Sequence, residues 1–152
     1  MAVEERLKEL GFSLPDPSRP VANYVGAVQA GNLVFVSGHG PRGPEGQRPL
    51  GKLGRDLTRE QGYEAARWCI LAGLASLKTV IGDLDRVRRI VKLLVMVNCT
   101  EDFGEQPQVA NGASDLLVEL FGDSGKHARS AVGMQMLPSN IPVEIEMIVE
   151  VA

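Results

Sequence analysis

The C-terminal stretch PVEIEMIVEV, residues 142–151, decides the fold class because apolar and charged residues alternate along it. A period of two places successive side chains on opposite faces of a β-strand. One face of this strand is apolar and is expected to lie in the core, whereas the other carries glutamates and Ile148. The preceding stretch HARSAVGMQML (127–137) is also strand-like, and the turn at 138–141 is expected to make the two strands antiparallel.

Two helices and a buried strand precede these strands. Thr58 begins a helical pattern that extends to about Ile81, and Thr58-Arg-Glu-Gln61 resembles a capping box. A second helix is expected over residues 107–121. Between the two helices, RIVKLLVMVN (89–98) is almost continuously hydrophobic, which predicts a strand buried on both faces.

The N-terminal part of the chain predicts a hairpin followed by a long loop. Residues 22–30 and 32–37 are strand-like, and Gly31-Asn32 between them indicates a two-residue turn. Six glycines and three prolines then fall within residues 37–54. This composition predicts a loop that is functional or mobile, with a short strand near Gln47–Leu50.

Residues 3–11 form an amphipathic helical pattern, and the prolines that follow make residues 13–20 a linker. The chain has 152 residues, a length typical of one domain. We therefore expect a single domain over residues 1–152, with residues 1–20 as an accessory helix and proline-rich linker. The element order β-β-(β)-α-β-α-β-β predicts an α+β fold, in which two helices cover one face of a mixed sheet.

Composition excludes several classes of protein. The formal net charge is −3 and aromatic residues make up 5%, so a basic, aromatic surface for nucleic acid is not expected. No stretch approaches the ~18 apolar residues of a membrane helix, and the charged N-terminus lacks the apolar core of a signal peptide. The chain has two cysteines, Cys69 and Cys99, which are far apart in sequence and form no CxxC pattern. Two thiols in an acidic chain of 152 residues suggest a reducing compartment, so a cytoplasmic location is expected.

Sequence motifs for nucleotides, hydrolase elbows and metals are missing. There is no Walker A pattern, GxGxxG or GxSxG. His39 and His127 are the only histidines and belong to no Cys/His cluster, so no metal site is expected. Both histidines are interpreted as hydrogen-bonded loop residues, and both cysteines as small buried side chains.

The sheet face away from the helices is expected to be partly apolar. We expect it to carry the glutamates of the last strand together with Arg129, Ala131, Gly133, Gln135 and Ile148. A sheet face of this kind is normally buried against another subunit. The backbone N–H groups of Ser37-Gly38-His39-Gly40, where the second strand ends, could bind an anion, and the alternative is an ordinary turn.

Arg129 and Glu144 are the candidates for chemistry. Arg129 could bind a carboxylate through its guanidinium fork, and the alternative is a salt bridge to a glutamate. Glu144 could act as a general base or acid if desolvation raises its pKa, and the alternative is a solvated or cross-subunit charge. An offset of about six residues would separate them by ~20 Å, so a shared site needs Arg129 from one subunit and Glu144 from a neighbour. This geometry predicts an obligate oligomer.

Several short motifs at the two ends of the chain form a combined signature. In the C-terminal part they are Arg129-Ser130-Ala131-Val132, Leu137-Pro138 and Val143-Glu144-Ile145-Glu146. In the N-terminal hairpin they are Tyr24-Val25, Gly31-Asn32-Leu33-Val34 and Ser37-Gly38. Together these motifs resemble the RidA/YjgF family. The resemblance spans residues 22–152. It implies the chorismate-mutase-like fold and a homotrimer, in which the sheets form a central barrel and ligand clefts lie between subunits.

The resemblance also implies hydrolysis of reactive 2-imino or enamine acids to 2-keto acids and ammonia, without a cofactor. By position, Arg129 would clamp the substrate carboxylate and Glu144 would hold or activate the attacking water. Further contacts to the substrate would come from Tyr24, Ser37, Gly38 and the backbone N–H of Ala131. Clamping the carboxylate fixes the imine carbon against the water, which is catalysis chiefly by orientation.

Two residues depart from the family pattern. Ala131 stands where many members have a cysteine, and His39 follows Ser37-Gly38 where glutamine is frequent. Two other functions stay open. One is non-catalytic binding of small metabolites in the same cleft; the other is an endoribonuclease or translation-inhibitor activity, which the acidic charge makes less attractive.

Overall fold

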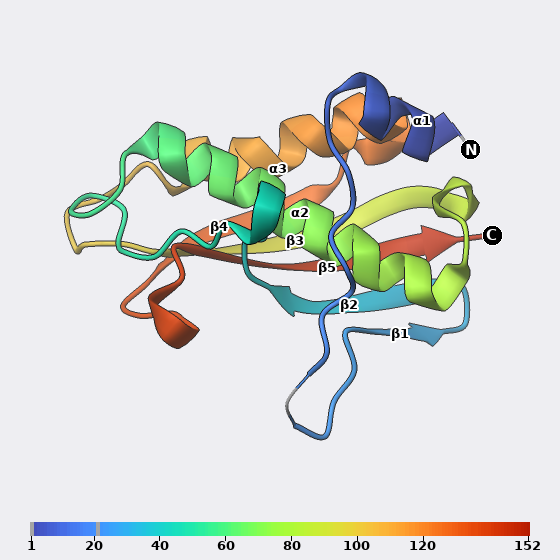
Figure 1. The fold of residues 1–152 in the computed structure, drawn as a ribbon, viewed down its shortest axis with the longest axis horizontal. Helices are drawn as coiled ribbons and strands as arrows, with labels where there is room; N and C mark the ends of the chain where they lie inside the picture. Colours follow the sequence, from blue (N-terminus) through green and yellow to red (C-terminus); the bar gives the residue numbers. More distant parts are fainter. Residues whose placement is uncertain (1, 21) are drawn as a thin grey trace.

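The structure, a computed structural model, describes residues 2–20 and 22–152 (Figure 1). Within that part of the chain, the sheet has five strands in the order β1-β2-β5-β3-β4. In chain order the strands are β1 (Ala27–Ala30), β2 (Leu33–His39), β3 (Val87–Asn98), β4 (Ala128–Met134) and β5 (Val143–Val151). The helices are α1 (Ala2–Glu9), α2 (Arg59–Ile81) and α3 (Gln106–Phe121). Helices α2 and α3 cover one face of the sheet, which confirms the predicted α+β class (Figure 1).

The alternation along β5 is confirmed. Its buried residues are Val143, Ile145, Met147, Val149 and Val151, none more than 2% exposed. They form the core with α2 and α3, whereas the glutamates and Ile148 lie on the opposite face. Helix α2 begins as predicted, because the Thr58 hydroxyl accepts from the Gln61 N–H at 3.1 Å and the Gln61 side chain accepts from the Thr58 N–H at 2.8 Å.

Strands β4 and β5 run in opposite directions, as expected, but they are not neighbours. Strand β3 lies between them, antiparallel to β5 and parallel to β4, with α3 as the crossover connection. The turn that joins β4 to β5 therefore passes over the end of β3. The buried Asn98 side chain fixes it there by donating to Asn140 Oδ1 at 2.9 Å and to the Ile141 carbonyl at 3.1 Å.

This topology corrects the predicted face of β4. Arg129 is in register with Leu93, and Ala131 with Val95, and both β3 residues are fully buried beneath the helices. Arg129, Ala131 and Gly133 therefore face α3, and the prediction that they share the uncovered face with the glutamates was wrong. The error arose because β4 takes its register from β3, and not from β5.

Two further details differ from expectation. Strand β1 begins only at Ala27, so residues 22–26 form a loop that leaves the sheet. The short strand expected near Gln47–Leu50 is absent; Leu53 instead makes isolated bridges to Cys99 and Leu57. After β2 the chain forms the 3₁₀ turn η1 (Pro44–Gly46), closed by a hydrogen bond from the Gly43 N–H to the Gln47 carbonyl at 2.9 Å.

The N-terminal segment is attached to the helical layer. Helix α1 lies against α3, and Glu4 pairs with Lys78 of α2 at 2.7 Å. The Arg67 guanidinium lies 4.5 Å from the ring centroid of Phe12, a cation–π contact. From α1 the chain runs past α2 to a loop on the far side of the sheet (Figure 1). This path places residues 18–20 and 22–26 near the end of β2.

Helices α2 and α3 approach each other closely at Gly112. A Cβ at Gly112 would overlap the backbone carbonyl of Tyr63. Because backbone cannot rotate away as a side chain can, we expect Gly112→Ala to lower the free energy of unfolding by about 1–3 kcal/mol in urea titrations. The control is Gly104→Ala, whose Cβ would meet nothing within 4 Å. Equal unfolding midpoints for the two variants would contradict the close approach.

Candidate functional site

A β-bulge interrupts β2 where it pairs with β5. Val36 pairs with Met147 and His39 with Ile145, so two residues, Ser37 and Gly38, lie opposite one residue of β5. The extra residue reverses the alternation and turns the His39 side chain under α2, the side on which Val36 lies. Bulges of this kind re-aim side chains and are common beside active sites.

His39 holds the bulge through both ring nitrogens. Nδ1 lies 2.6 Å from the Ser37 carbonyl oxygen, and Nε2 lies 2.7 Å from the hydroxyl of the buried Ser76 on α2. These partners assign the proton to Nδ1, which donates to the carbonyl, while Nε2 accepts from Ser76. Burial lowers the pKa of His39, the Ser37 carbonyl raises it and Arg42 lowers it. The ring is therefore neutral at neutral pH and, as predicted, hydrogen-bonded.

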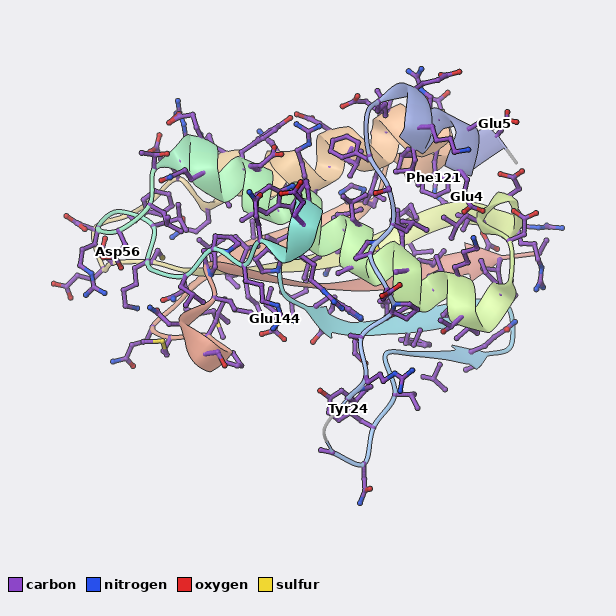
Figure 2. All side chains as sticks on the ribbon, in the orientation of Figure 1. Glu4, Glu5, Tyr24, Asp56, Phe121 and Glu144 are labelled. Atoms are coloured by element: carbon purple, nitrogen blue, oxygen red, sulfur yellow. The ribbon has the colours of Figure 1, made fainter. Side chains whose placement is uncertain are left out.

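Glu144 lies directly against Gly38. A Cβ at Gly38 would overlap Oε2 of Glu144, so only glycine leaves room for this carboxylate. Glu144 is half-buried, and Figure 2 shows it on the side of the sheet away from α2 and α3. Desolvation raises the pKa of Glu144, and the nearby Glu146 raises it further. A carboxylate with a raised pKa suits proton transfer.

A cleft of about 290 Å³ opens beside Gly38. Its walls come from the loop before β1, from the loop after β2 and from the turn before β5. Tyr24 lines it from the first of these loops, which projects below the sheet in Figure 2. The Ser37 hydroxyl donates to the Val25 carbonyl at 2.6 Å and so fixes this loop to β2. The structure thus brings four predicted site residues together: Tyr24, Ser37, Gly38 and Glu144.

A larger hollow, of about 1,020 Å³, lies at the carboxyl ends of β3 and β4. Lys52 spans part of it by donating to Asn98 Oδ1 at 2.7 Å and to the Gln135 carbonyl. None of the six predicted site residues lines this hollow. The smaller cleft is therefore the candidate site, because Gly38 in its wall contacts the carboxylate whose pKa is raised.

Arg129 lies near the other edge of the sheet, on the helix side. Its Nη1 donates to Asn111 Oδ1 at 2.9 Å and to Ser114 Oγ at 3.1 Å, both on α3. Ser114 Oγ also lies 2.8 Å from Nε2 of His127, whose Nδ1 lies 2.7 Å from the Gly125 carbonyl oxygen. Arg129 forms no ion pair with any residue that the structure describes, so a salt bridge to a glutamate does not form within the described part of one chain.

Arg129 and Glu144 do not meet within one chain. Arg129 is level with Leu93 and Glu144 with Met96. Three residues along the sheet and two strands across it give a separation of roughly 14 Å, less than the ~20 Å expected. The two side chains nevertheless leave opposite faces of the sheet. Arg129 and Ala131 are thus separated from the cleft beside Gly38.

Other polar residues of the cleft were not predicted from the sequence. Arg19, Arg42 and Arg48 line it, and Ser76 supports it from below through His39. Each of these arginines adjoins a proline in a loop, as in Arg19-Pro20 and Arg48-Pro49. An arginine next to a proline in a loop is a weak sequence signal for a binding site, but it could have pointed to these three residues.

The cysteines and the potential metal ligands that the structure describes form no second candidate site. Both cysteines are buried; the Cys69 thiol donates to the Val143 carbonyl at 3.4 Å, and burial raises its pKa. Among residues 2–20 and 22–152, no three histidine, cysteine, aspartate or glutamate side chains are grouped to hold a metal ion. In the same part of the chain, no helix is long and apolar enough to cross a membrane.

Residues 4–151 match the family model described as "YjgF/chorismate_mutase-like, putative endoribonuclease". The chain belongs to the YjgF/chorismate mutase-like family. Within it, Protein TCP17 of Trypanosoma cruzi is 45% identical over 149 residues, which cover 97% of this chain and 93% of that protein. The crystal structure of Atu1372 from Agrobacterium tumefaciens, a protein of unknown function, matches with a TM-score of 0.91 at 44% identity, covering 99% of this chain and 94% of that one.

Two more distant proteins carry functional information in their names. The 2-iminobutanoate/2-iminopropanoate deaminase of Dermatophagoides farinae is 29% identical over 91% of this chain and 93% of its own length. Escherichia coli TdcF, solved with bound serine, shares the fold at a TM-score of 0.64 and 22% identity, covering 90% of this chain and 94% of that one. The resemblance to the RidA/YjgF family and its chorismate-mutase-like fold is confirmed.

Proposed function

We propose that the protein hydrolyses reactive 2-imino acids and their enamine tautomers to 2-keto acids and ammonia. The observation that carries the proposal is the half-buried Glu144 carboxylate, whose pKa is raised and which lies against Gly38 beside a small cleft. The 2-iminobutanoate deaminase of the same family supports this reaction class.

The reaction requires a group that moves protons between water and nitrogen. Glu144 accepts a proton from water as the oxygen adds to C2 of the imine, and passes that proton to the imine nitrogen. Glu144 then accepts the hydroxyl proton of the resulting 2-amino-2-hydroxy acid as C2 becomes a carbonyl. It delivers this second proton to the nitrogen as the C–N bond breaks and ammonia leaves, so atoms balance and no electrons are transferred.

Arg129 of a second copy is the proposed clamp for the substrate carboxylate, with the backbone N–H of Ala131 as a further donor. Support comes from the opposite orientations of Arg129 and Glu144 within one chain, which prevent one copy from holding both ends of a small acid. The uncovered sheet face also exposes Val28, Phe35 and Val132. An apolar sheet face suits burial against neighbouring copies, and a homotrimer is the proposed assembly.

The deciding experiment generates 2-iminobutanoate in situ from 2-aminobutanoate with an amino acid oxidase. The measurement is the rate at which ammonia and 2-oxobutanoate form after the oxidase step. The protein is expected to raise this rate well above that of hydrolysis in buffer. If the imine is shown to form but ammonia and 2-oxobutanoate appear no faster than in buffer, the deaminase proposal is refuted.

Binding without turnover is the second candidate function. The serine-bound structure of TdcF, which has the same fold, favours a cleft that accepts small amino or keto acids. Calorimetric binding of 2-oxobutanoate by a protein that leaves the imine untouched would select this function. Salt-sensitive RNA binding would instead point to the RNA-directed alternative, which the net charge of −3 disfavours.

Gly38→Ala tests whether the position of Glu144 matters. The new Cβ would displace the Glu144 carboxylate, which is the far end of a flexible side chain, so the fold is expected to survive. We expect turnover to fall by roughly 10- to 100-fold, because small misplacements of reacting groups cost that much. Gly104→Ala is the control and should keep full activity. Full activity in Gly38→Ala would show that turnover does not depend on the position of the Glu144 carboxylate.

A further inference from the structure

The cleft beside Gly38 has an unusual charge. Three arginines and no carboxylate line it, although the protein carries a net charge of −3. Arg42 is oriented by donation from its Nη1 to the Asp16 carbonyl at 3.0 Å. Arg19 and Arg48 are exposed, and their side chains make no hydrogen bond or ion pair with any residue that the structure describes.

Arginines elsewhere on the surface contrast with these. Arg6, Arg55, Arg59 and Arg67 each pair with a carboxylate at 2.9–3.2 Å. Other arginines, such as Arg129, also lack an acidic partner, but Arg19, Arg42 and Arg48 differ from them because all three line one recess that no carboxylate lines. Guanidinium groups in a recess attract anions and fit carboxylates through two parallel hydrogen bonds.

The cleft and Glu144 are connected through Gly38. Gly38 lines the cleft, and the carboxylate of Glu144 lies in contact with Gly38. A substrate with C2 beside Glu144 could therefore extend its side chain into the arginine-lined space. The volume of about 290 Å³ is at the small end for ligand pockets, which suits a short chain.

We infer that the preferred substrates are imines of acidic amino acids, that is 2-imino dicarboxylates, whose distal carboxylate binds Arg19 and Arg48. This inference rests on the proposed deaminase function. The first carboxylate would bind Arg129 of the neighbouring copy and the second would bind the cleft arginines. Each negative charge of the substrate then has a guanidinium partner, and the arrangement also offsets repulsion by Glu144.

The test compares imines formed in situ from glutamate and from 2-aminopentanoate, which has the same five-carbon chain without the distal carboxylate. We expect kcat/KM to be at least about tenfold higher for the acidic imine. The Arg19→Gln/Arg48→Gln double variant should lose this preference while its rate on the neutral imine stays within about twofold. Arg88→Gln, an exposed arginine at the opposite end of the sheet, is the control. Equal kcat/KM for both imines, or equal losses on both in the double variant, would overturn the inference.

A binding measurement separates this inference from the proposed function. Calorimetry would titrate the protein with 2-oxoglutarate, 2-oxopentanoate and inorganic phosphate. Tighter binding of 2-oxoglutarate that is lost in the double variant supports the dicarboxylate site, even if no imine is hydrolysed and the deaminase proposal fails. Equal binding of the two oxo acids overturns the inference, even if the neutral imine is hydrolysed. Phosphate binding stronger than that of 2-oxoglutarate also overturns it, because the cleft would then favour phosphate.

Discussion

Arg129→Ala is expected to lower kcat/KM for the imine by about 100- to 1,000-fold, the usual cost of removing one well-placed charged donor. The guanidinium fork is proposed to hold the substrate carboxylate, so its loss leaves the imine carbon without a fixed position against the water. Arg129→Lys should recover only part of the rate, because an ammonium group lacks the planar fork. The measurement is ammonia release under the conditions used for the wild-type protein.

Two controls separate this effect from loss of structure. Arg129 Nη1 donates to Asn111 and Ser114, so the variant also removes two hydrogen bonds to α3. Gel filtration with light scattering and a thermal unfolding curve should show the same assembly and a stable fold. Arg88→Ala removes an exposed arginine from the same domain and should keep its activity. Unchanged turnover in Arg129→Ala would refute the assignment of the carboxylate clamp.

The local elements could be read from the sequence because short-range physics determines them. Alternation over residues 142–151 predicted both faces of β5, and the Thr58 capping box predicted the start of α2. The Gly31-Asn32 turn of the first hairpin also holds, and Gly31 has the φ of +63° that favours glycine. In each case the information lies within a few residues of the element it specifies.

The face of β4 could not be read in the same way, because its partner is remote in sequence. Arg129 lies beside Leu93, and nothing within residues 127–137 indicates that pairing. The bulge at Ser37 and Gly38 is a similar case. A strict alternation from Val36 would put His39 on the uncovered face, whereas one extra residue places it under α2. Faces that depend on non-local register need the assembled sheet.

In the candidate site, too, some residues could be predicted from the sequence and others only from the folded structure. Resemblance to the family pointed to Tyr24 and Gly38, which line one cleft, and to Glu144, whose carboxylate lies against Gly38. The arginines of that cleft come from loops whose courses depend on tertiary contacts, such as the packing of Gly43 on the ring of Trp68. No periodic pattern marks such residues, so the charge of the cleft became visible only in three dimensions.

Glu144→Gln is expected to reduce kcat/KM by about 100- to 10,000-fold, the range for losing a general base. The amide keeps the size of the side chain beside Gly38 but cannot accept the proton of water. Desolvation raises the pKa of Glu144 above the ordinary 4.5. The carboxylate is therefore protonated as the pH falls through a value higher than usual, and wild-type kcat/KM should fall on its acid side from that higher pH.

The same variant has an opposite effect on stability. A carboxyl group whose pKa is raised on folding stabilises the fold below its unfolded pKa, and this contribution is lost as the pH rises through its folded pKa. Glu144→Gln removes the desolvated charge, so its thermal midpoint should exceed that of the wild-type protein near pH 8. Near pH 4 the difference should shrink. A variant that is less stable and inactive would indicate a structural role for Glu144.

Mixing the two inactive variants tests whether each site is shared between copies. In random co-assemblies of Arg129→Ala and Glu144→Gln subunits, about a quarter of the sites would combine an intact Arg129 with an intact Glu144 from its neighbour, because each contribution is intact with a probability of about one half in a cyclic assembly. Activity near a quarter of the wild-type value is therefore expected after co-expression with two tags. If both residues served one site from the same chain, mixing would restore nothing. That result would contradict the proposal that each site takes Arg129 from one copy and Glu144 from another.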